Sequence, residues 1–394
     1  MSNQFYIEVN CQQKNHDGER ICGDVFISKR IKEEKRIIAV LSDGMGHGVK
    51  ANILATLTAS MAVNFTKEHK DFNTIAEIIM NTLPVCSIRK ISYSTFTIID
   101  IEIDGKVSIL EYDNPQTLII RNKKEFNPEW QCIILNSENN RGKELRACEF
   151  YPEKGDRIIF CSDGVVQSGL GTPRYPFGWG NNNLRDFVFE TIEKKSYISA
   201  RRLAKKVLNA AVGNDNYKPK DDISCASIFF REPRKLLLIT GPPFEKKKDI
   251  DLAMAVYKYQ GKKIICGATT AEVVARELGL EIRDSMEFLD NDLPPISYID
   301  GINLVTEGIL TLGKVVEILK EHTSEYVPGR GPADQIVELF LKSDEINIIV
   351  GTRINIAHQD PTLPVELEIR RTVVKRVARL LEEKFLKEVT MEYI

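Results

Sequence analysis

The sequence is poor in the features that mark disulfide scaffolds and zinc modules. Its eight cysteines are Cys11, Cys22, Cys86, Cys132, Cys148, Cys161, Cys225 and Cys266. No two of them have the close spacing of a zinc knuckle or of a redox CxxC motif. Several lie inside apolar runs, as Cys161 and Cys266 do. We expect these thiols to be small buried side chains of a protein in a reducing compartment.

Long apolar runs and an excess of one charge are also missing. No apolar run approaches the roughly 20 residues of a membrane-spanning helix, and Met1–Asn10 lacks the basic-then-apolar order of a secretion signal. The chain has 54 Lys and Arg against 56 Asp and Glu, so its formal net charge is −2 and it offers no basic excess to nucleic acid or anionic lipid. We therefore expect a cytoplasmic protein that binds no nucleic acid and no membrane.

What is present is a globular chain long enough for more than one domain. Its 394 residues are 43% hydrophobic and 28% charged, close to the average of folded proteins. At about 100–200 residues per domain, this length favours two or three domains. The pattern changes at Arg231–Arg234, which predicts one domain over residues 1–232 and a second over residues 233–394.

The first domain is dominated by short strand-like runs. These runs cover residues 36–41, 96–103, 107–112, 117–121, 131–135 and 157–161. Helical periodicity appears only over 50–65 and 203–212. In the first of these helices, we expect the apolar side chains to pack in the core: Ile53, Leu54, Leu57, Met61 and Val63. Strands packed with a few helices predict an α+β layered domain.

In the second domain strands alternate with helices. Predicted strands cover 235–240, 263–266 and 346–350, and predicted helices cover 249–259, 270–278, 309–320 and about 365–389. This alternation is typical of parallel βαβ units, so we predict a smaller α/β domain with a parallel sheet. The charged amphipathic C-terminal helix would pack within the domain or form a homodimer contact.

One short motif occurs twice in the first domain. An apolar strand leads into Ser42-Asp43-Gly44, and a second leads into Ser162-Asp163-Gly164. Asp24 and Asp222 stand at comparable strand ends. A single SDG is most simply a strand followed by a turn, because Asp-Gly is favoured in turns. Four aspartates at strand ends instead favour a site for Mg²⁺ or Mn²⁺, whose preferred ligands are carboxylate oxygens.

The order and spacing of these and neighbouring motifs resemble those of the metal-dependent type 2C serine/threonine phosphatases, specifically the bacterial stage II sporulation protein E branch. The resemblance covers residues of about 5–230 and does not extend over the second domain. The motifs that carry it are Gly23-Asp24 with Phe26, Leu41-Ser42-Asp43-Gly44-Met45-Gly46-His47-Gly48, Tyr112-Asp113-Asn114-Pro115, Cys161-Ser162-Asp163-Gly164 with Gly169, and Asp221-Asp222-Ile223-Ser224.

The resemblance implies a fold, an activity and a metal centre. The fold would be a sandwich of two antiparallel sheets flanked by helices, and the activity would be hydrolysis of phosphoserine or phosphothreonine on a bacterial regulatory protein. Two Mn²⁺ or Mg²⁺ ions would be bound, with Asp43 bridging them, Asp24 and the Gly44 carbonyl holding one, and Asp163 with Asp222 holding the other. These four aspartates would act through a metal-bridging water that attacks phosphorus directly.

Some assignments remain open at this stage. His47 could protonate the leaving oxygen or be an ordinary polar loop residue. Asp221 could be a metal ligand, but pairing with Lys220 is favoured. Arg20 and Lys220 could attract a phosphate, although lone cations near loops are usually only solvated. Alternative functions for the domain are a small-molecule phosphoesterase and a catalytically weak regulatory module of the same fold.

The second domain offers two candidate ligand sites at strand-to-helix turns. One is Gly241, and the other is Gly267–Thr270. Helix N-termini after parallel strands suit small anionic ligands, although Thr270 could equally be a helix cap. The GxGxxG motif and the GK[ST] loop are absent, which argues against a dinucleotide or P-loop site. A ligand bound there could regulate the first domain, because the helix at 50–65 corresponds to a switch element in the sporulation branch.

Overall fold

The computed structural model describes residues 5–31, 33–82, 94–103, 105–138, 140–285, 287–290, 292–322, 327–353, 363–385 and 387–394. The chain divides into two compact units, Met1–Glu232 and Pro233–Ile394. Cys86 lies outside the described residues. Among the described helices, none is long and apolar enough to cross a membrane.

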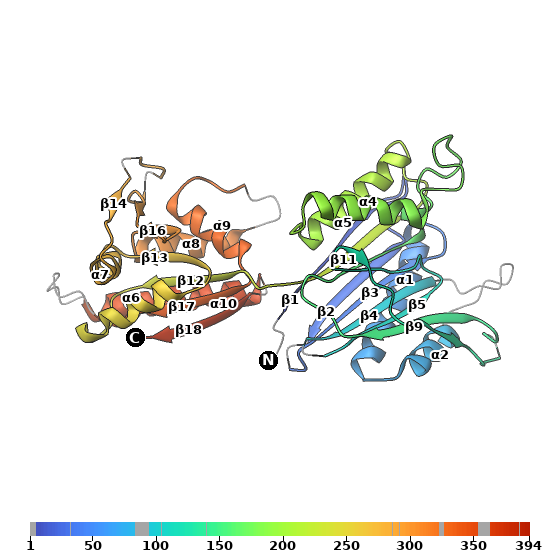
Figure 1. Ribbon diagram of the computed structural model, residues 1–394, viewed down its shortest axis with the longest axis horizontal. Helices are drawn as coiled ribbons and strands as arrows, with labels where there is room; N and C mark the ends of the chain where they lie inside the picture. The colour runs from blue at the N-terminus through green and yellow to red at the C-terminus, as the bar shows by residue number, and fades with distance from the viewer. Residues whose placement is uncertain are drawn as a thin grey trace. The chain divides into compact units, whose positions relative to one another are not determined.

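Two antiparallel sheets form the centre of the first unit (Figure 1). One has the order β1-β11-β10-β6-β7, with bounds Tyr6–Lys14, Ile223–Arg231, Arg157–Cys161, Leu118–Arg121 and Lys124–Glu125. The other has the order β2-β3-β4-β5-β9-β8, with bounds Asp24–Ile31, Arg36–Gly44, Ser94–Glu102, Val107–Tyr112, Glu144–Phe150 and Gln131–Ile134. The two sheets pack face to face, because one apolar cluster takes alternate residues from both, such as Leu41 and Ile99 from one and Phe160 and Ile228 from the other.

Helices cover both outer faces of this sandwich. On the six-stranded sheet lie α1 (Gly48–Lys67) and α2 (Phe72–Thr82), which share a core with Val40 and Ile98. On the five-stranded sheet lie α4 (Gly180–Lys194) and α5 (Ala200–Asn214), with the short α3 (Asp163–Val166) directly after β10. This is the predicted α+β sandwich of two antiparallel sheets flanked by helices, and the fold prediction is confirmed.

Helix α1 packs differently from the prediction made for it. Its buried face is made of small side chains, namely Ala51, Ala55, Thr58, Ala59 and Ala62, together with Val63. Ile53 and Leu57 are 60% and 44% exposed, so the prediction that these two side chains pack in the core was wrong. Small residues bring the helix close to β3, because a Cβ added at Gly44 would overlap the carbonyl of Ala51. Ile53 and Leu57 consequently face outward, whereas Val63 is buried and Met61 packs against the core as predicted.

The second unit is built on one mostly parallel sheet of order β14-β15-β16-β13-β12-β17-β18. In that order the bounds are Arg283–Asp284, Ser297–Tyr298, Leu304–Thr306, Lys262–Cys266, Lys235–Thr240, Glu345–Val350 and Glu388–Tyr393. Its helices are α6 (Asp249–Lys258), α7 (Ala268–Leu278), α8 (Ile309–Glu321), α9 (Pro332–Lys342) and α10 (Leu363–Glu383). Separate apolar clusters on the two sheet faces involve α6 with α7 and α8 with α9 and α10. The predicted parallel α/β domain is confirmed.

The C-terminal helix ends earlier than its periodicity predicted. The prediction extended it to about residue 389, but α10 ends at Glu383 and Glu388–Tyr393 forms β18. This strand pairs in parallel with β17 along its whole length. Pairing with a strand distant in sequence overrides the local helical pattern here, because it satisfies the backbone groups of the last residues.

Candidate active site

The predicted aspartates lie at neighbouring strand ends of the first unit. Asp24 begins β2 and pairs directly with Asp43 near the end of β3. Asp163 follows the end of β10, and Asp222 precedes β11; these strands are paired, and the Ser162 N–H donates to the Ser224 carbonyl (3.0 Å). A Cβ added at Gly23 would lie 2.7 Å from Asp222 Oδ2, so the acidic ends of the two sheets meet.

Close packing explains the glycine that follows each aspartate of the repeated motif. A Cβ at Gly44 would overlap the backbone of Ala51 on α1, and one at Gly164 would overlap the carbonyl of Asp222. Neither glycine has a positive φ. The two glycines are therefore required by the approach of neighbouring backbone to the strand ends, a constraint that the sequence alone does not distinguish from a turn.

A hollow of about 640 Å³ opens over this site. Its lining residues are Asp43, Met45, Gly46, His47, Ser94, Thr95, Asp113, Asn114, Pro115, Asp163, Gln167, Lys220 and Asp221. Two of the predicted site residues, Asp43 and Asp163, line this hollow. Asp24 and Asp222 are buried beneath it, and Gly44 is buried as well.

Asp221, the neighbour that was expected to pair with Lys220, faces the hollow in place of Asp222. The Lys220 ammonium donates to the carbonyl of Leu170 (2.8 Å), and Asp221 Oδ1 accepts from the Asp222 N–H (2.8 Å). Asp222 turns inward, where its Oδ1 accepts from the His16 N–H (3.0 Å). Because successive side chains at a strand end point in opposite directions, only one of two adjacent aspartates reaches a given face. The placement favours Asp221 over Asp222 as the group that reaches the hollow.

Burial and mutual repulsion raise the pKa of these carboxyl groups. Burial, with the charges of Asp222 and Asp221 as smaller contributions, raises the pKa of Asp24 to about 7. Burial, then the proximity of Asp24, Asp163 and Asp221, raises the pKa of Asp43 well above its usual value. Burial and Asp163 raise the pKa of Asp221 to about 6. Ionising these carboxyl groups therefore costs free energy, and a bound cation would offset that cost.

The donor set suits a divalent cation. Several carboxylate oxygens are buried without a hydrogen-bond partner among the described residues: both of Asp24, Oδ1 of Asp163 and Oδ2 of Asp222. Such oxygen-only donors fit Mg²⁺ or Mn²⁺. The part of the chain that the structure describes nevertheless contains no group of three or more Asp, Glu, His or Cys side chains already gathered to hold an ion.

Two histidines lie beside the acidic site. His47 lines the hollow, its Nδ1 is 2.7 Å from Glu19 Oε1, and its ring stacks on His16 with centroids 4.4 Å apart. The Glu19 contact fixes the orientation of an otherwise exposed imidazole. This arrangement favours a defined role for His47 over that of an ordinary loop residue. Arg20, the other candidate for attracting phosphate, is exposed and does not line the hollow.

Other lining residues were not singled out from the sequence as chemical groups. The Gln167 amide donates to Asp163 Oδ2 (2.7 Å), four residues away across one turn of α3. The Thr95 hydroxyl donates to Asn114 Oδ1 (2.5 Å), and Asn114 Nδ2 donates to Thr97 Oγ1 (3.1 Å). Asp113 adopts a φ of 56°, and burial followed by the charge of Asp163 raises its pKa. Two signals could have identified some of them: Asp113 and Asn114 belong to a motif that carries the family resemblance, and Asp163 and Gln167 have i,i+4 spacing.

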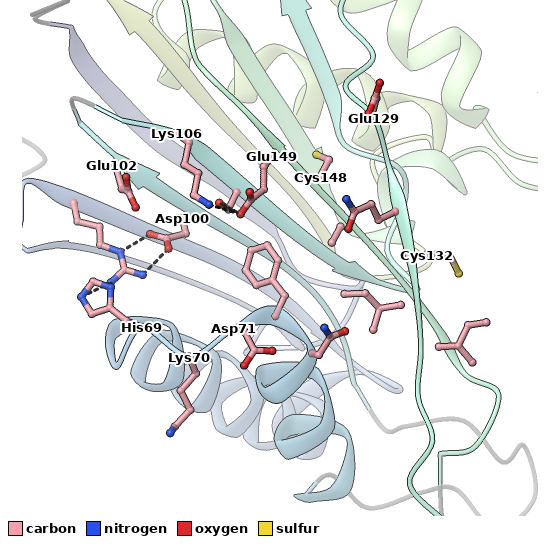
Figure 2. A pocket seen from close by; sticks show the side chains of 18 residues that line it. His69, Lys70, Asp71, Asp100, Glu102, Lys106, Glu129, Cys132, Cys148 and Glu149 are labelled. Atoms are coloured by element: carbon pink, nitrogen blue, oxygen red, sulfur yellow. Dashed lines mark hydrogen bonds and ion pairs between the residues drawn. The ribbon is translucent and has the colours of Figure 1, made fainter.

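A second hollow, of about 780 Å³, lies between α2 and the outer face of the six-stranded sheet (Figure 2). Two of its cations are paired with carboxylates: Arg36 binds Asp100 through two contacts (2.7 and 2.5 Å), and Lys106 Nζ lies 2.7 Å from Glu149 Oε1. The predicted aspartates do not line it. These pairs join neighbouring inner strands of the sheet, β3 with β4 and the start of β5 with β9.

In the second unit, other residues of the chain contact both turns that were predicted to bind a ligand. Gly241 has a φ of 83°, and a Cβ there would lie 2.5 Å from Arg370 Nη1 and 2.8 Å from the Gly351 carbonyl. The Gly267 N–H donates to the carbonyl of Thr306 (2.8 Å), and Thr270 is buried in the first turn of α7. Ligand binding at either turn stays a prediction.

The sandwich and the acidic strand ends define a phosphatase domain of the type 2C class. Within that class, the model of the Stage II sporulation protein E (SpoIIE) family matches residues 33–230, half of the chain, and the chain belongs to this family. The resemblance drawn from the motifs is thereby confirmed. The second unit lies outside the match.

Three of the solved structures to which the chain is similar follow. The phosphatase domain of SpoIIE from Bacillus subtilis with a fragment of its regulatory domain is 15% identical with a TM-score of 0.46, covering 58% of this chain and 64% of that one. RsbX in complex with magnesium is 18% identical with a TM-score of 0.41, covering 58% and 98%. The catalytic domain of PstP in complex with two manganese ions is 11% identical with a TM-score of 0.37, covering 58% and 100%. No curated protein matches the chain.

Proposed function

We propose that the Met1–Glu232 unit hydrolyses phosphoserine or phosphothreonine on a regulatory protein. The observation that carries the proposal is the meeting of Asp24, Asp43, Asp163 and Asp221 at the adjoining ends of two sheets, beneath or within one open hollow. Carboxylates crowded in this way, with raised pKa values and unpartnered oxygens, mark a functional site rather than a stabilising one.

Asp43 is the central residue of the proposed site. The charges of Asp24, Asp163 and Asp221 all act on its carboxyl group. Asp43 would therefore contribute to both of two adjacent metal positions, with Asp24 and the Gly44 carbonyl on one side and Asp163 with Asp221 on the other. Asp222 would support the site from behind, where it accepts from the His16 N–H.

When bound, two divalent cations at these positions supply charge neutralisation for the phosphate and an acidified water as nucleophile. The residues of the chain do the remaining work. Gln167 orients Asp163 through its amide, and Lys220 adds positive charge at the edge of the hollow. His47, oriented by Glu19, lines the hollow and would protonate the leaving oxygen.

The experiment that tests this function compares substrates. We expect the full chain with Mn²⁺ to release phosphate from phosphoserine and phosphothreonine peptides with a higher kcat/KM than from small phosphate esters. Preference for the small esters would support a small-molecule phosphoesterase instead. Metal-dependent binding of the peptides without turnover would support a regulatory module.

We further propose that the Pro233–Ile394 unit is an input that modulates this activity, with a small anionic ligand as its signal. Its support is the presence of a separate compact unit outside the phosphatase fold. The test is a comparison of kcat/KM at saturating Mn²⁺ between the full chain and residues 1–232, which should differ. Equal values, with no thermal stabilisation of the full chain by phosphate or nucleotide anions, would leave the unit a scaffold.

A further inference from the structure

A structured loop borders the acidic hollow on one side. Residues 167–179 connect α3 to α4, and the loop begins at Gln167, which lines the hollow and binds Asp163. A Cβ added at Gly178 would lie 3.0 Å from the Cα of Gln167, so the loop returns to its starting point. The base of the loop, where Gln167 and Gly178 lie side by side, therefore stands at the edge of the site.

Internal contacts hold this loop in one shape. The Trp179 N–H donates to the Ser168 carbonyl (2.9 Å), and the Tyr175 N–H donates to the Thr172 hydroxyl (3.1 Å). The buried Trp179 ring packs against Phe187 with centroids 5.5 Å apart. Two prolines, at 173 and 176, restrict the backbone further. A side chain presented by such a loop loses little conformational freedom on binding a partner.

A second loop is tied to the first and borders the same hollow. The carboxylate of Asp215 accepts from the Gly169 N–H (2.7 Å) in one loop and from the Lys220 N–H (3.4 Å) in the other. The Lys220 ammonium, which lines the hollow, donates to the carbonyl of Leu170 (2.8 Å). The two loops thus form one continuous edge.

Three apolar side chains on these loops face solvent. Leu170, Phe177 and Tyr217 are 44%, 92% and 79% exposed, and we call them the apolar rim. Tyr217 also holds a φ of 63°, which is costly for a bulky residue, while its N–H donates to the Val212 carbonyl (2.9 Å). Large apolar groups held rigidly in water contribute nothing to the core and are typical of binding surfaces.

We propose that the apolar rim binds apolar side chains flanking the phosphorylated residue of the protein substrate. The inference rests on the proposed phosphatase function. The apolar rim is continuous with the acidic hollow, because Gln167 and Lys220 of the same two loops line that hollow. A polypeptide whose phosphorylated side chain enters the hollow must cross its edge, so a polypeptide is the ligand that reaches the rim. A small phosphate ester fills the hollow without reaching the rim.

The test uses the full chain with Mn²⁺ and three substrates: p-nitrophenyl phosphate, a phosphoserine peptide flanked by alanines, and the same peptide flanked by leucine and phenylalanine. We expect the wild type to prefer the apolar peptide. Phe177→Ala and Tyr217→Ala should each lower kcat/KM for that peptide about fivefold or more, mainly through KM. Neither variant should change hydrolysis of p-nitrophenyl phosphate.

Tyr197→Ala is the matched control. Tyr197 is 86% exposed in the same unit but lies beside the start of β10, where Arg157 donates to the carbonyls of Ser196 and Ile198. It should behave as wild type with all three substrates. Wild-type kinetics of the rim variants on both peptides, with normal hydrolysis of p-nitrophenyl phosphate, would overturn the inference and leave the phosphatase function intact. Absence of metal-dependent hydrolysis of every substrate by the wild type would instead remove the proposed function on which the inference rests.

Discussion

Asp24 and Asp43 stand directly opposite one another on the antiparallel strands β2 and β3. Both are acidic residues in a largely buried setting, and the charge of Asp24 contributes to the raised pKa of Asp43. Directly opposed like charges destabilise a strand pair. A cation bound by both carboxylates would offset this repulsion, which accounts for two aspartates at opposed positions.

The two adjacent aspartates before β11 should differ in importance. Asp221→Asn should lower kcat by about 100-fold, because it removes a charged oxygen donor that reaches the hollow. Asp222→Asn should lower kcat by less than about tenfold, because the asparagine Oδ1 can still accept from the His16 N–H. Steady-state kinetics at saturating Mn²⁺ measure both. The reverse order of effects would return the ligand role to Asp222.

The glycine after Asp43 should be intolerant of a methyl group. Gly44→Ala should reduce the free energy of unfolding by about 1–3 kcal/mol and strongly reduce turnover, because α1 must move away from β3. Gly213→Ala in α5 is the control: a Cβ there meets open space, so the helix should gain roughly 0.5–1 kcal/mol. Urea unfolding of both variants provides the comparison. Equal stability of Gly44→Ala and the wild type would show that α1 does not approach β3 this closely.

Proton and metal binding should compete at the site. The pKa values of about 7 for Asp24 and about 6 for Asp221 exceed the usual 3.8, so the folded state binds more protons than the unfolded state between about pH 4 and 7. In chelator, the contribution of these groups to stability should therefore fall as pH rises through this range. Added Mn²⁺ must displace those protons, so the rise in Tm that it causes should be larger near pH 8 than near pH 5.5. A metal-induced rise that is equal at both pH values would contradict this.

His47 should contribute to the departure of a poor leaving group. His47→Ala should lower kcat for a phosphoserine peptide by about 100-fold, within the range of general acid catalysis, and much less for p-nitrophenyl phosphate, whose leaving group needs no proton. Glu19→Gln should have a smaller effect of the same kind, because Glu19 only orients the ring. Parallel losses on both substrates would indicate a structural role for His47.

Local pattern was sufficient for much of the fold. The strands Val107–Tyr112 and Lys235–Thr240 have the predicted bounds, because β-branched or apolar runs end there at turn residues. Helices α2, α4 and α9 were not predicted; α4, for instance, has a polar start at Gly180-Asn181-Asn182-Asn183. The predicted C-terminal helix ran to about residue 389 and so overlapped the start of strand β18, because the parallel pairing of β18 with β17 is a contact between distant segments.

The site was predictable as a set of strand-end aspartates but not in its detail. The choice between Asp221 and Asp222 depends on which of two adjacent side chains faces the hollow, and a shift of one residue in register reverses that choice. The contacts of Glu19 with His47 and of Asp215 with Gly169 join loops far apart in the sequence. No local periodicity carries such information.

The two-metal site around Asp43 is tested most directly by titrating the chelator-treated full chain with Mn²⁺ near pH 8. The heat of binding and the hydrolysis of p-nitrophenyl phosphate are followed together. We expect two ions to bind per chain, turnover to appear only as they bind, and Asp43→Asn to lose both binding and turnover. Undiminished turnover in excess chelator, or full activity of Asp43→Asn, would contradict it.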